Sequence, residues 1–517
     1  MRGARTIAGA LVFADLLVGG CGGTGSTSDA GDADEAQRGD GGTSGASAGW
    51  MEHDCRMQIP DGLNADDYRC GTLMVDGEGG DELLSIEVAV LEASADTPAP
   101  DPLVFVGGGP GSASLDGYLQ THSAAVLSPI REARDIVFFD QRGSGRATPS
   151  LECPEVVDAT VASLSRDDSP EEEGTAVLDA YEDCRERLER EGVALRGYHG
   201  AAVARDIDAL MAALGYERFN LYGISYGGRI AQVMLRDRPQ RVRSAILDAS
   251  VLPAGNIATD SARNVSDALE ALFSDCLAAG SCDAELPERL YQAQAQLDET
   301  PHAVDVIGDA RITTVVVNGH RALLLLRGLL SPERSGSVPS VIDQWVEGGY
   351  GLLDLAAPRL VPQPGRATHG FYATVLCAEE VPFETDESLA RGVEGIRPEL
   401  VQAMAPGGGE FNLELCRRWD VDARPAIENE AITSDVPVLI LHGSYDASVH
   451  PGSSSRAHES FANSQHILFD GYGHGVLRSL PGSAEEPSCP QRLVAEFLDD
   501  PMATLDASCA ASSASEP

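Results

Sequence analysis

Apolar and polar positions along the chain predict an alternation of strands and helices. Short apolar segments rich in β-branched residues and bounded by turn residues predict strands at 83–91, 102–106, 136–139, 219–222 and 245–247. Residues 203–214 carry apolar side chains at helical spacing and end at Gly215, which is typical of a helix with a glycine cap. A further helix is expected at 229–236. This alternation predicts an α/β fold with a mainly parallel sheet and helices on both faces.

The alternation stops near residue 253 and resumes after residue 433. Between them the pattern is predominantly helical, as at 262–278 and 321–330, and strands are expected again at 436–441 and 467–469. We therefore expect a helical cap inserted into one catalytic domain, rather than a second independent domain. The predicted divisions are a core at 51–252, a cap at 253–433 and the rest of the core at 434–517.

The first 50 residues have the pattern of an exported protein. Residues 1–21 combine two arginines, an apolar stretch and Val18-Gly19-Gly20-Cys21, which looks like a bacterial lipobox. Residues 22–50 are mostly Gly, Ser, Thr, Ala and Asp, a composition typical of a flexible tether. We expect a lipid on Cys21 and a lipoprotein of the cell envelope. The alternative is an ordinary cleaved signal peptide and a secreted protein.

Composition and charge exclude several kinds of function. The chain of 517 residues has 37 basic residues, all of them arginine, against 81 acidic ones, a formal charge of −44. The absence of lysine excludes Schiff-base chemistry, a Ser-Lys dyad and a P-loop. Strong acidity with scattered arginines argues against a nucleic-acid partner. A membrane is expected as a partner only through the lipid anchor.

The cysteines support the same compartment. Cys21 apart, ten remain, an even number in a chain that we expect to be exported. Pairing of neighbours is the simplest scheme, and it joins Cys55 to Cys70, Cys153 to Cys184, Cys276 to Cys282, Cys377 to Cys416 and Cys489 to Cys509. No C-x-x-C grouping suggests a metal, so neither a metal nor another cofactor is expected.

One G-x-S-x-G motif lies where a nucleophile elbow requires it. Gly223-Ile224-Ser225-Tyr226-Gly227 follows an apolar strand and precedes a helix, so the chain would turn sharply and expose the serine oxygen. A second match at 45–49 lies in the tether, with neither element beside it. We therefore assign Ser225 as the nucleophile. Its alternative interpretation is a plain strand-to-helix turn.

A serine nucleophile needs a base and an acid that orients the base. In this fold the order is serine, acid, histidine, each after a later strand. Asp446 follows the strand at 436–441 and His474 follows the strand at 467–469, so we assign these two. Their rivals are Asp470, His442, His450 and His466.

The oxyanion of an attacked carbonyl needs backbone donors. Gly107-Gly108-Gly109-Pro110-Gly111 directly follows the strand at 102–106, and we assign the N–H groups of Gly108 or Gly109 as donors. Tyr226, the residue after the nucleophile, supplies the other N–H. A phosphate loop is excluded here, since the chain has no lysine and no G-x-x-x-x-G-K pattern.

These motifs together resemble the α/β-hydrolases of the prolyl aminopeptidase and tripeptidyl aminopeptidase type. The similar segments include GGGPG at 107–111, the segment 138–153, the segment 221–242 and LCAEEVPF at 376–383, within a span of about 55 to 498. Two departures are Gly107, where prolyl iminopeptidases usually have histidine, and Ser448-Val449-His450-Pro451, where Thr-Pro is frequent after the acid.

The resemblance implies a helical cap and a site for the free α-ammonium of a peptide. Glu379 and Glu380 match the acidic residues that would bind this ammonium, by a charge-assisted contact. It also implies that Arg142 is a structural brace for the oxyanion loop.

The predicted activity is acyl transfer by a serine hydrolase on a short peptide with a free N-terminus. An esterase or lactonase with the same triad is the alternative among enzymes, because a fold does not determine the leaving group. A surface lipoprotein that binds peptides without catalysis is the alternative outside enzymes.

Overall fold

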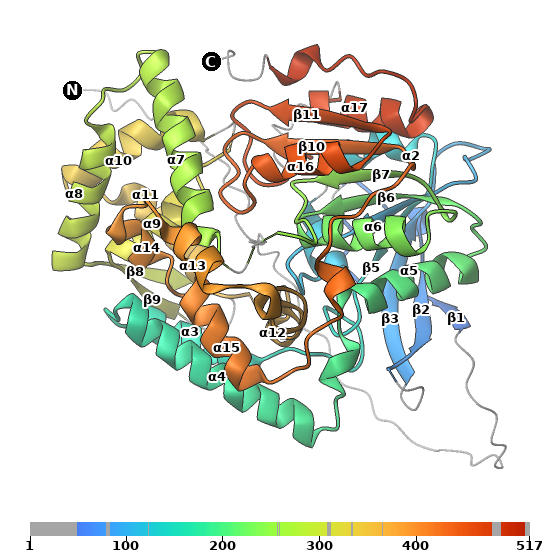
Figure 1. Ribbon diagram of the computed structural model, residues 1–517, viewed down its shortest axis with the longest axis horizontal. Helices are drawn as coiled ribbons and strands as arrows, with labels where there is room; N and C mark the ends of the chain where they lie inside the picture. Colours follow the sequence, from blue (N-terminus) through green and yellow to red (C-terminus); the bar gives the residue numbers. More distant parts are fainter. Residues whose placement is uncertain are drawn as a thin grey trace, which may run out of the picture.

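The fold is built on one large sheet, seen on the right of the computed structural model in Figure 1. The structure describes residues 49–511, except 61, 79–82, 122–123, 256, 258, 308–311, 332–333, 364 and 478–486. The predicted signal peptide, Cys21 and most of the tether lie outside the described residues. Among the described helices, none combines the length and the apolar content that a membrane span requires.

The sheet has nine strands, and six of them form its parallel part. Their order across the sheet is β1-β2-β3-β5-β4-β6-β7-β10-β11. The antiparallel strands are β1 (Gly49–His53), β2 (Tyr68–Asp76) and β3 (Leu83–Leu91). The parallel strands are β4 (Leu103–Val106), β5 (Ile136–Phe139), β6 (Phe219–Ile224), β7 (Val242–Asp248), β10 (Val438–Gly443) and β11 (Ser464–Phe469). The carboxyl ends of these six strands therefore meet at one edge.

Helices cover both faces of the sheet, as predicted. Two separate hydrophobic cores lie between the helices and the two faces. One face packs on α5 (Gly200–Ala213), α6 (Tyr226–Asp237) and α16 (Gly452–Ser460). The other packs on α2 (Ala124–Arg131) and α17 (Cys489–Asp499). The strands β4, β5 and β6 are buried along their whole length, which explains their continuous apolar sequences.

A layer of helices occupies the left and lower parts of Figure 1. From the segment 253–433 it contains α7 (Ser261–Ala278), α8 (Leu286–Glu299), α9 (Gly319–Arg327), α10 (Val338–Val346), α11 (Gly351–Ala356), α12 (His369–Val375), α13 (Asp386–Val393), α14 (Pro398–Ala403) and α15 (Gly409–Trp419). It also contains a hairpin, which the sequence pattern did not predict, formed by β8 (His302–Ile307) and β9 (Ile312–Val317). A third hydrophobic core fills this layer.

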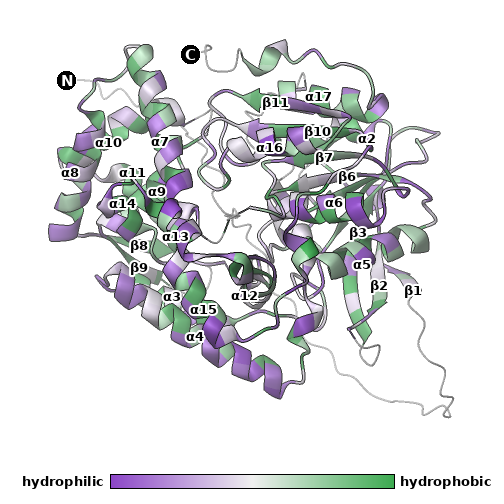
Figure 2. Ribbon diagram, viewed as in Figure 1, coloured by the Kyte–Doolittle hydropathy of each residue, from purple (hydrophilic) through white to green (hydrophobic). Residues whose placement is uncertain are grey.

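Two helices from before the cap segment belong to the same layer in space. They are α3 (Pro154–Leu164) and α4 (Pro170–Arg190), which contact β9 and α15. Figure 2 shows hydrophilic residues along much of α4, and its buried positions recur every three to four residues between Pro170 and Leu188. The division of the chain at residues 253 and 433 stays a prediction, and the layer described here extends beyond it.

Five disulfides join the ten cysteines in the predicted pairs. Cys153–Cys184 links α3 to α4 across 31 residues, and Cys377–Cys416 links the segment after α12 to α15 across 39 residues. These two therefore hold the helical layer together at positions far apart in sequence. Cys489–Cys509 attaches the C-terminal residues to α17.

The length of the closed loop predicts how much each disulfide stabilises the fold. Replacing Cys153 and Cys184 together by serine should lower the free energy of unfolding by about 3 to 4 kcal/mol, since a long loop regains much entropy in the unfolded chain. The matched control is the double serine variant of Cys276 and Cys282, six residues apart, with an expected loss of about 2 kcal/mol. Denaturant unfolding measures both losses, and a larger loss in the control would contradict the expected dependence on loop length.

Candidate active site

The turn between β6 and α6 holds Ser225 in an uncommon backbone conformation. Ser225 has φ 56° and ψ −122°, values that non-glycine residues rarely adopt and that cluster at functional sites. The close approach of β4 requires the glycines around it, because a Cβ on Gly227 would lie 2.0 Å from the Val106 carbonyl oxygen. This geometry is that of a nucleophile elbow.

The glycine loop after β4 passes directly beside Ser225. A Cβ on Gly108 would lie 2.9 Å from the Ser225 Cβ, so only glycine permits this approach. The Gly108 N–H donates to the Tyr118 hydroxyl at 3.2 Å. Since that N–H already has an acceptor, we favour Gly109 as the loop's oxyanion donor.

The residue that holds the glycine loop is Gln141, next to the predicted brace Arg142. The Gln141 side-chain amide donates to the Gly107 carbonyl at 2.8 Å. Arg142 instead forms a buried bidentate ion pair with Asp206 of α5, at 2.6 and 2.7 Å. It therefore joins the segment after β5 to α5 rather than to the loop.

Asp446 and His474 lie in direct contact. His474 Nδ1 is 2.8 Å from Asp446 Oδ2, and Asp446 is buried while the His474 side chain is 22% exposed. The backbone N–H groups of Ser448 and Val449 donate to Asp446 Oδ1 at 2.8 and 3.0 Å. Burial alone would raise the pKa of Asp446, but the neighbouring imidazoles and hydrogen bonds hold that pKa well below its usual range. The carboxylate is thus ionised and fixed in orientation.

The rival residues lie elsewhere or do something else. Asp470 is exposed, His450 pairs with Asp267 at 3.3 Å, and His466 contacts Ser454 at 2.8 Å.

His442 is the exception, because it contacts the same oxygen of Asp446, Oδ2, as His474 does. His442 Nε2 is 3.0 Å from Asp446 Oδ2 and 2.9 Å from the Val449 carbonyl. Burial opposes protonation of this imidazole, yet the hydrogen bond to Asp446 raises the pKa of His442 above its ordinary value. His442 therefore positions the acid. Sequence reasoning placed it only at the strand end.

Asp248, at the end of β7, connects the Ser225 turn to the loop of His474. Its carbonyl accepts from the Ser225 N–H at 3.0 Å. Its carboxylate accepts from the N–H groups of Val476 and Leu477 at 3.0 and 3.2 Å and from the Tyr222 hydroxyl. Burial raises the pKa of Asp248 above its usual value. Sequence reasoning missed this residue, although an acidic residue directly after a buried apolar strand is a usable signal.

The predicted ammonium-binding residues Glu379 and Glu380 lie in a buried ion-pair cluster around Arg229 of α6. Arg229 Nε is 3.1 Å from Glu379 Oε2, and Arg229 Nη1 contacts Glu380 Oε1. Glu379 also accepts from the Tyr226 hydroxyl at 3.3 Å and from the Gly200 N–H. Burial raises the pKa of Glu380 to about 8. The cluster adjoins the nucleophile through Tyr226.

One group of side chains in this cluster has the spacing of metal ligands. His199, Glu379 and Glu428 each offer an atom within 4.8 Å of the other two. Arg229 and Arg424 already contact the two carboxylates and supply positive charge there. We therefore assign no ion to this group.

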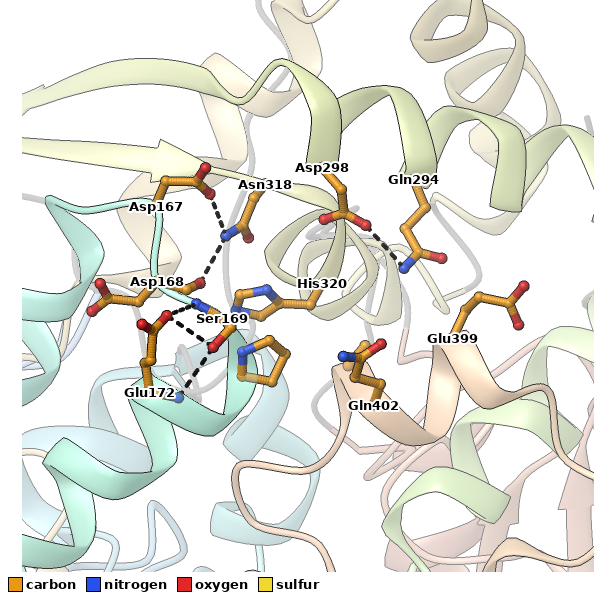
Figure 3. A pocket seen from close by; sticks show the side chains of 12 residues that line it. Asp167, Asp168, Ser169, Glu172, Gln294, Asp298, Asn318, His320, Glu399 and Gln402 are labelled. Atoms are coloured by element: carbon orange, nitrogen blue, oxygen red, sulfur yellow. Dashed lines mark hydrogen bonds between the residues drawn. The ribbon is translucent and has the colours of Figure 1, made fainter.

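Two cavities lie near these elements. One, of about 330 Å³, is bordered by His474, by the acid loop at Tyr445, Ala447 and Ser448, and by α9. The other, of about 280 Å³, lies between α4, α8, α9 and α14 and is drawn in Figure 3. Of these two, only the first is bordered by His474; Ser225 and the glycine loop are not among its lining residues, so it lies beside the histidine rather than over the nucleophile.

The contact between Asp446 and His474 predicts which acid matters. Asp446→Asn should lower hydrolysis of an activated ester, p-nitrophenyl butyrate, by about 10³- to 10⁴-fold, because the amide would leave the imidazole in the wrong tautomer. The rival acid gives the control, since Asp470→Asn should change the rate less than about twofold. A large loss in Asp470→Asn with activity retained in Asp446→Asn would reverse the assignment.

Comparison with known proteins agrees with this geometry. Residues 101–283 match the family model of the α/β hydrolase fold, and residues 408–509 match that of TAP-like proteins. The chain is 24% identical over 405 residues to the serine protease Hip1 of Mycobacterium tuberculosis, covering 72% of this chain and 75% of that protein. It is 25% identical over 397 residues to the tripeptidyl aminopeptidase of Streptomyces lividans, covering 72% and 71%.

A shorter match, 30% identical over 213 residues, is to carboxylesterase B of Mycobacterium tuberculosis, covering 39% of this chain and 40% of that protein. Strand order, the Ser225 turn and both family models lead to the same conclusion. The chain belongs to the α/β-hydrolase family, in the branch that carries the TAP-like C-terminal domain.

Proposed function

We propose that this protein is a serine peptidase in which Ser225, His474 and Asp446 form the catalytic triad. The observation that carries the proposal is the 2.8 Å contact between His474 and a buried, ionised Asp446, in a fold whose nucleophile elbow holds Ser225 at positive φ. Relatives named serine protease and tripeptidyl aminopeptidase support peptides as the substrate class.

The reaction follows from these positions. His474 Nε2 takes the proton from the Ser225 hydroxyl as its oxygen attacks the peptide carbonyl. The N–H groups of Gly109 and Tyr226 stabilise the negative charge on the carbonyl oxygen. His474 then gives the proton to the leaving amine as the C–N bond breaks. Water repeats the sequence on the acyl-enzyme and releases the acid.

We further propose that the enzyme binds the free N-terminus of its peptide substrate and cleaves a bond at a fixed distance from it. Glu379 adjoins the nucleophile through the Tyr226 hydroxyl, so negative charge lies on the Tyr226 side of Ser225. Arg229 neutralises this charge in part, but two acidic side chains share one guanidinium, and the buried Glu380 Oε2 atom has no hydrogen-bond partner among the described residues. With its pKa raised to about 8, Glu380 holds a proton at neutral pH, and an ammonium group beside it would favour the ionised form and pair with it.

The second candidate is an esterase with the same residues. The match to carboxylesterase B favours it, and the triad chemistry is the same for an alcohol leaving group. The five disulfides support an exported protein in either case. Attachment by a lipid on Cys21 and release as a secreted protein are both proposals for its final location.

Removal of the Ser225 hydroxyl gives the first test. Ser225→Ala should abolish peptide cleavage and covalent labelling by a fluorophosphonate, because the variant lacks the oxygen that forms the acyl-enzyme in the proposed mechanism. Mass spectrometry of the labelled wild-type protein should place the adduct on Ser225. The remaining G-x-S-x-G serine gives a control, so Ser47→Ala should be labelled like the wild type. A folded wild-type protein that is not labelled at all would favour a non-catalytic binding protein.

Blocking the substrate's amine separates the peptidase from the esterase. Alanyl-arylamides with a free amine should be cleaved with a kcat/KM at least about tenfold higher than their N-acetylated forms, because only the free form carries the ammonium. Short peptides with free and acetylated N-termini, with products read by mass, extend the comparison. Equal rates with free and blocked amines would remove the ammonium site from this account.

A further inference from the structure

The cavity bordered by His474 is lined by positive charge. Its described lining includes four arginines, Arg321, Arg327, Arg334 and Arg359, and one carboxylate, Glu173. Glu173 is itself paired, with Arg321 at 3.2 Å and with His320 at 3.0 Å. Within the described lining of this cavity, arginines therefore outnumber carboxylates.

A cluster of arginines is unexpected in a chain with this composition. The sequence has 81 acidic residues against 37 arginines. The neighbouring cavity in Figure 3 follows that excess, since its labelled lining includes Asp167, Asp168, Glu172, Asp298 and Glu399. The arginine-lined cavity next to His474 differs from this overall acidic composition, and its lining would favour an anionic ligand.

Among the arginines that line this cavity, Arg327 contacts the loop of Asp446, through Ser448. The four arginines that the structure describes as buried all have a carboxylate within ion-pair distance: Arg134, Arg142, Arg229 and Arg321. Arg327 is partly exposed and has no such carboxylate among the described residues, where its guanidinium donates one hydrogen bond, from Nη2 to Ser448 Oγ at 2.6 Å. Burial lowers the pKa of Arg327, and nearby Asp446 offsets part of that effect. A guanidinium has five N–H donors, so several are left for a ligand.

The position of Arg327 relates this charge to one end of the substrate. Arg327 ends α9, and its partner Ser448 donates its own N–H to Asp446 Oδ1 at 2.8 Å. His474, which contacts the same residue Asp446, protonates the leaving amine in the proposed mechanism. The cavity that His474 borders therefore lies on the leaving-group side, whereas Glu379 and Tyr226 lie on the side of the substrate's N-terminus.

We propose that Arg327 binds a carboxylate on the leaving-group part of the peptide substrate and makes the enzyme selective for such peptides. This inference rests on the proposed function, because it assigns a specificity to the same site. The carboxylate has two possible sources, the free C-terminus of a short peptide or an acidic side chain. Either would pair bidentately with a planar guanidinium.

Three peptides with a free amino terminus separate the two sources. They are Ala-Ala-Ala-Gln amide, Ala-Ala-Ala-Gln with a free carboxyl end and Ala-Ala-Ala-Glu amide. Their kcat/KM values are measured with wild-type protein, Arg327→Met, Arg327→Lys and Ser448→Ala, and product masses identify the cleaved bond. Ser448→Ala is the matched control, because it removes the hydrogen bond of Arg327 to the acid loop but keeps the charge.

The wild type should cleave at least one carboxylate peptide about 10- to 100-fold faster than the neutral amide, as expected for a hydrogen bond between charged groups. The peptide that gains identifies the source. In Arg327→Met this ratio should fall below about threefold, Arg327→Lys should restore part of it, and Ser448→Ala should keep it.

Three results would overturn the inference. They are no carboxylate preference in the wild type, a preference that persists in Arg327→Met, and an equal loss of preference in Ser448→Ala, which would make Arg327 a support of the acid loop. Fluorophosphonate labelling is measured in parallel. A wild type that is labelled but shows no carboxylate preference rejects this inference alone, whereas a wild type that is neither labelled nor active rejects the proposed function.

Discussion

The site depends on one buried carboxylate, that of Asp248 at the end of β7. This carboxylate accepts hydrogen bonds from the N–H groups of Val476 and Leu477, far away in the sequence. The backbone carbonyl of Asp248 accepts from the Ser225 N–H. These contacts keep the loop of His474 beside the turn of Ser225, although the helical layer separates the two in sequence. Burying this carboxylate with fewer hydrogen-bond donors would cost several kcal/mol in desolvation, so its three donors, the Tyr222 hydroxyl and the N–H groups of Val476 and Leu477, stabilise this position.

Charge is distributed unevenly around that centre. The arginines that lie buried in the described part of the chain are all paired with carboxylates, so they join distant segments of the fold and add no net positive charge. On the Tyr226 side of Ser225, two acidic side chains, Glu379 and Glu380, share one guanidinium, that of Arg229. On the His474 side, Arg327 has no carboxylate partner in the described part of the chain. A short peptide carries an ammonium at its N-terminus and a carboxylate at its C-terminus. We therefore assign its N-terminus to the Tyr226 side of the site and its C-terminus to the His474 side.

The sequence was sufficient to single out the turn at Ser225 and the loops of Asp446 and His474, because each directly follows an apolar strand. It also predicted the five disulfide pairs. It did not reveal Asp248, the role of His442, or the contact of Gly108 with Tyr118, because each depends on how strands and loops pack in three dimensions. Helices α3 and α4 were missed for a related reason, since their place in the helical layer depends on contacts with elements far away in sequence, such as β9 and α15.

The central claim is that Ser225, His474 and the glycine loop act on one carbonyl, and the crystal structure of a phosphonate adduct tests it most directly. We predict phosphorus bonded to Ser225 Oγ, a phosphonate oxygen about 2.7 to 3.1 Å from the N–H nitrogens of Gly109 and Tyr226, and His474 Nε2 within about 3.2 Å of Oγ or of a second phosphonate oxygen. Phosphorus bonded to another residue, or an oxygen directed away from both N–H groups, would contradict it.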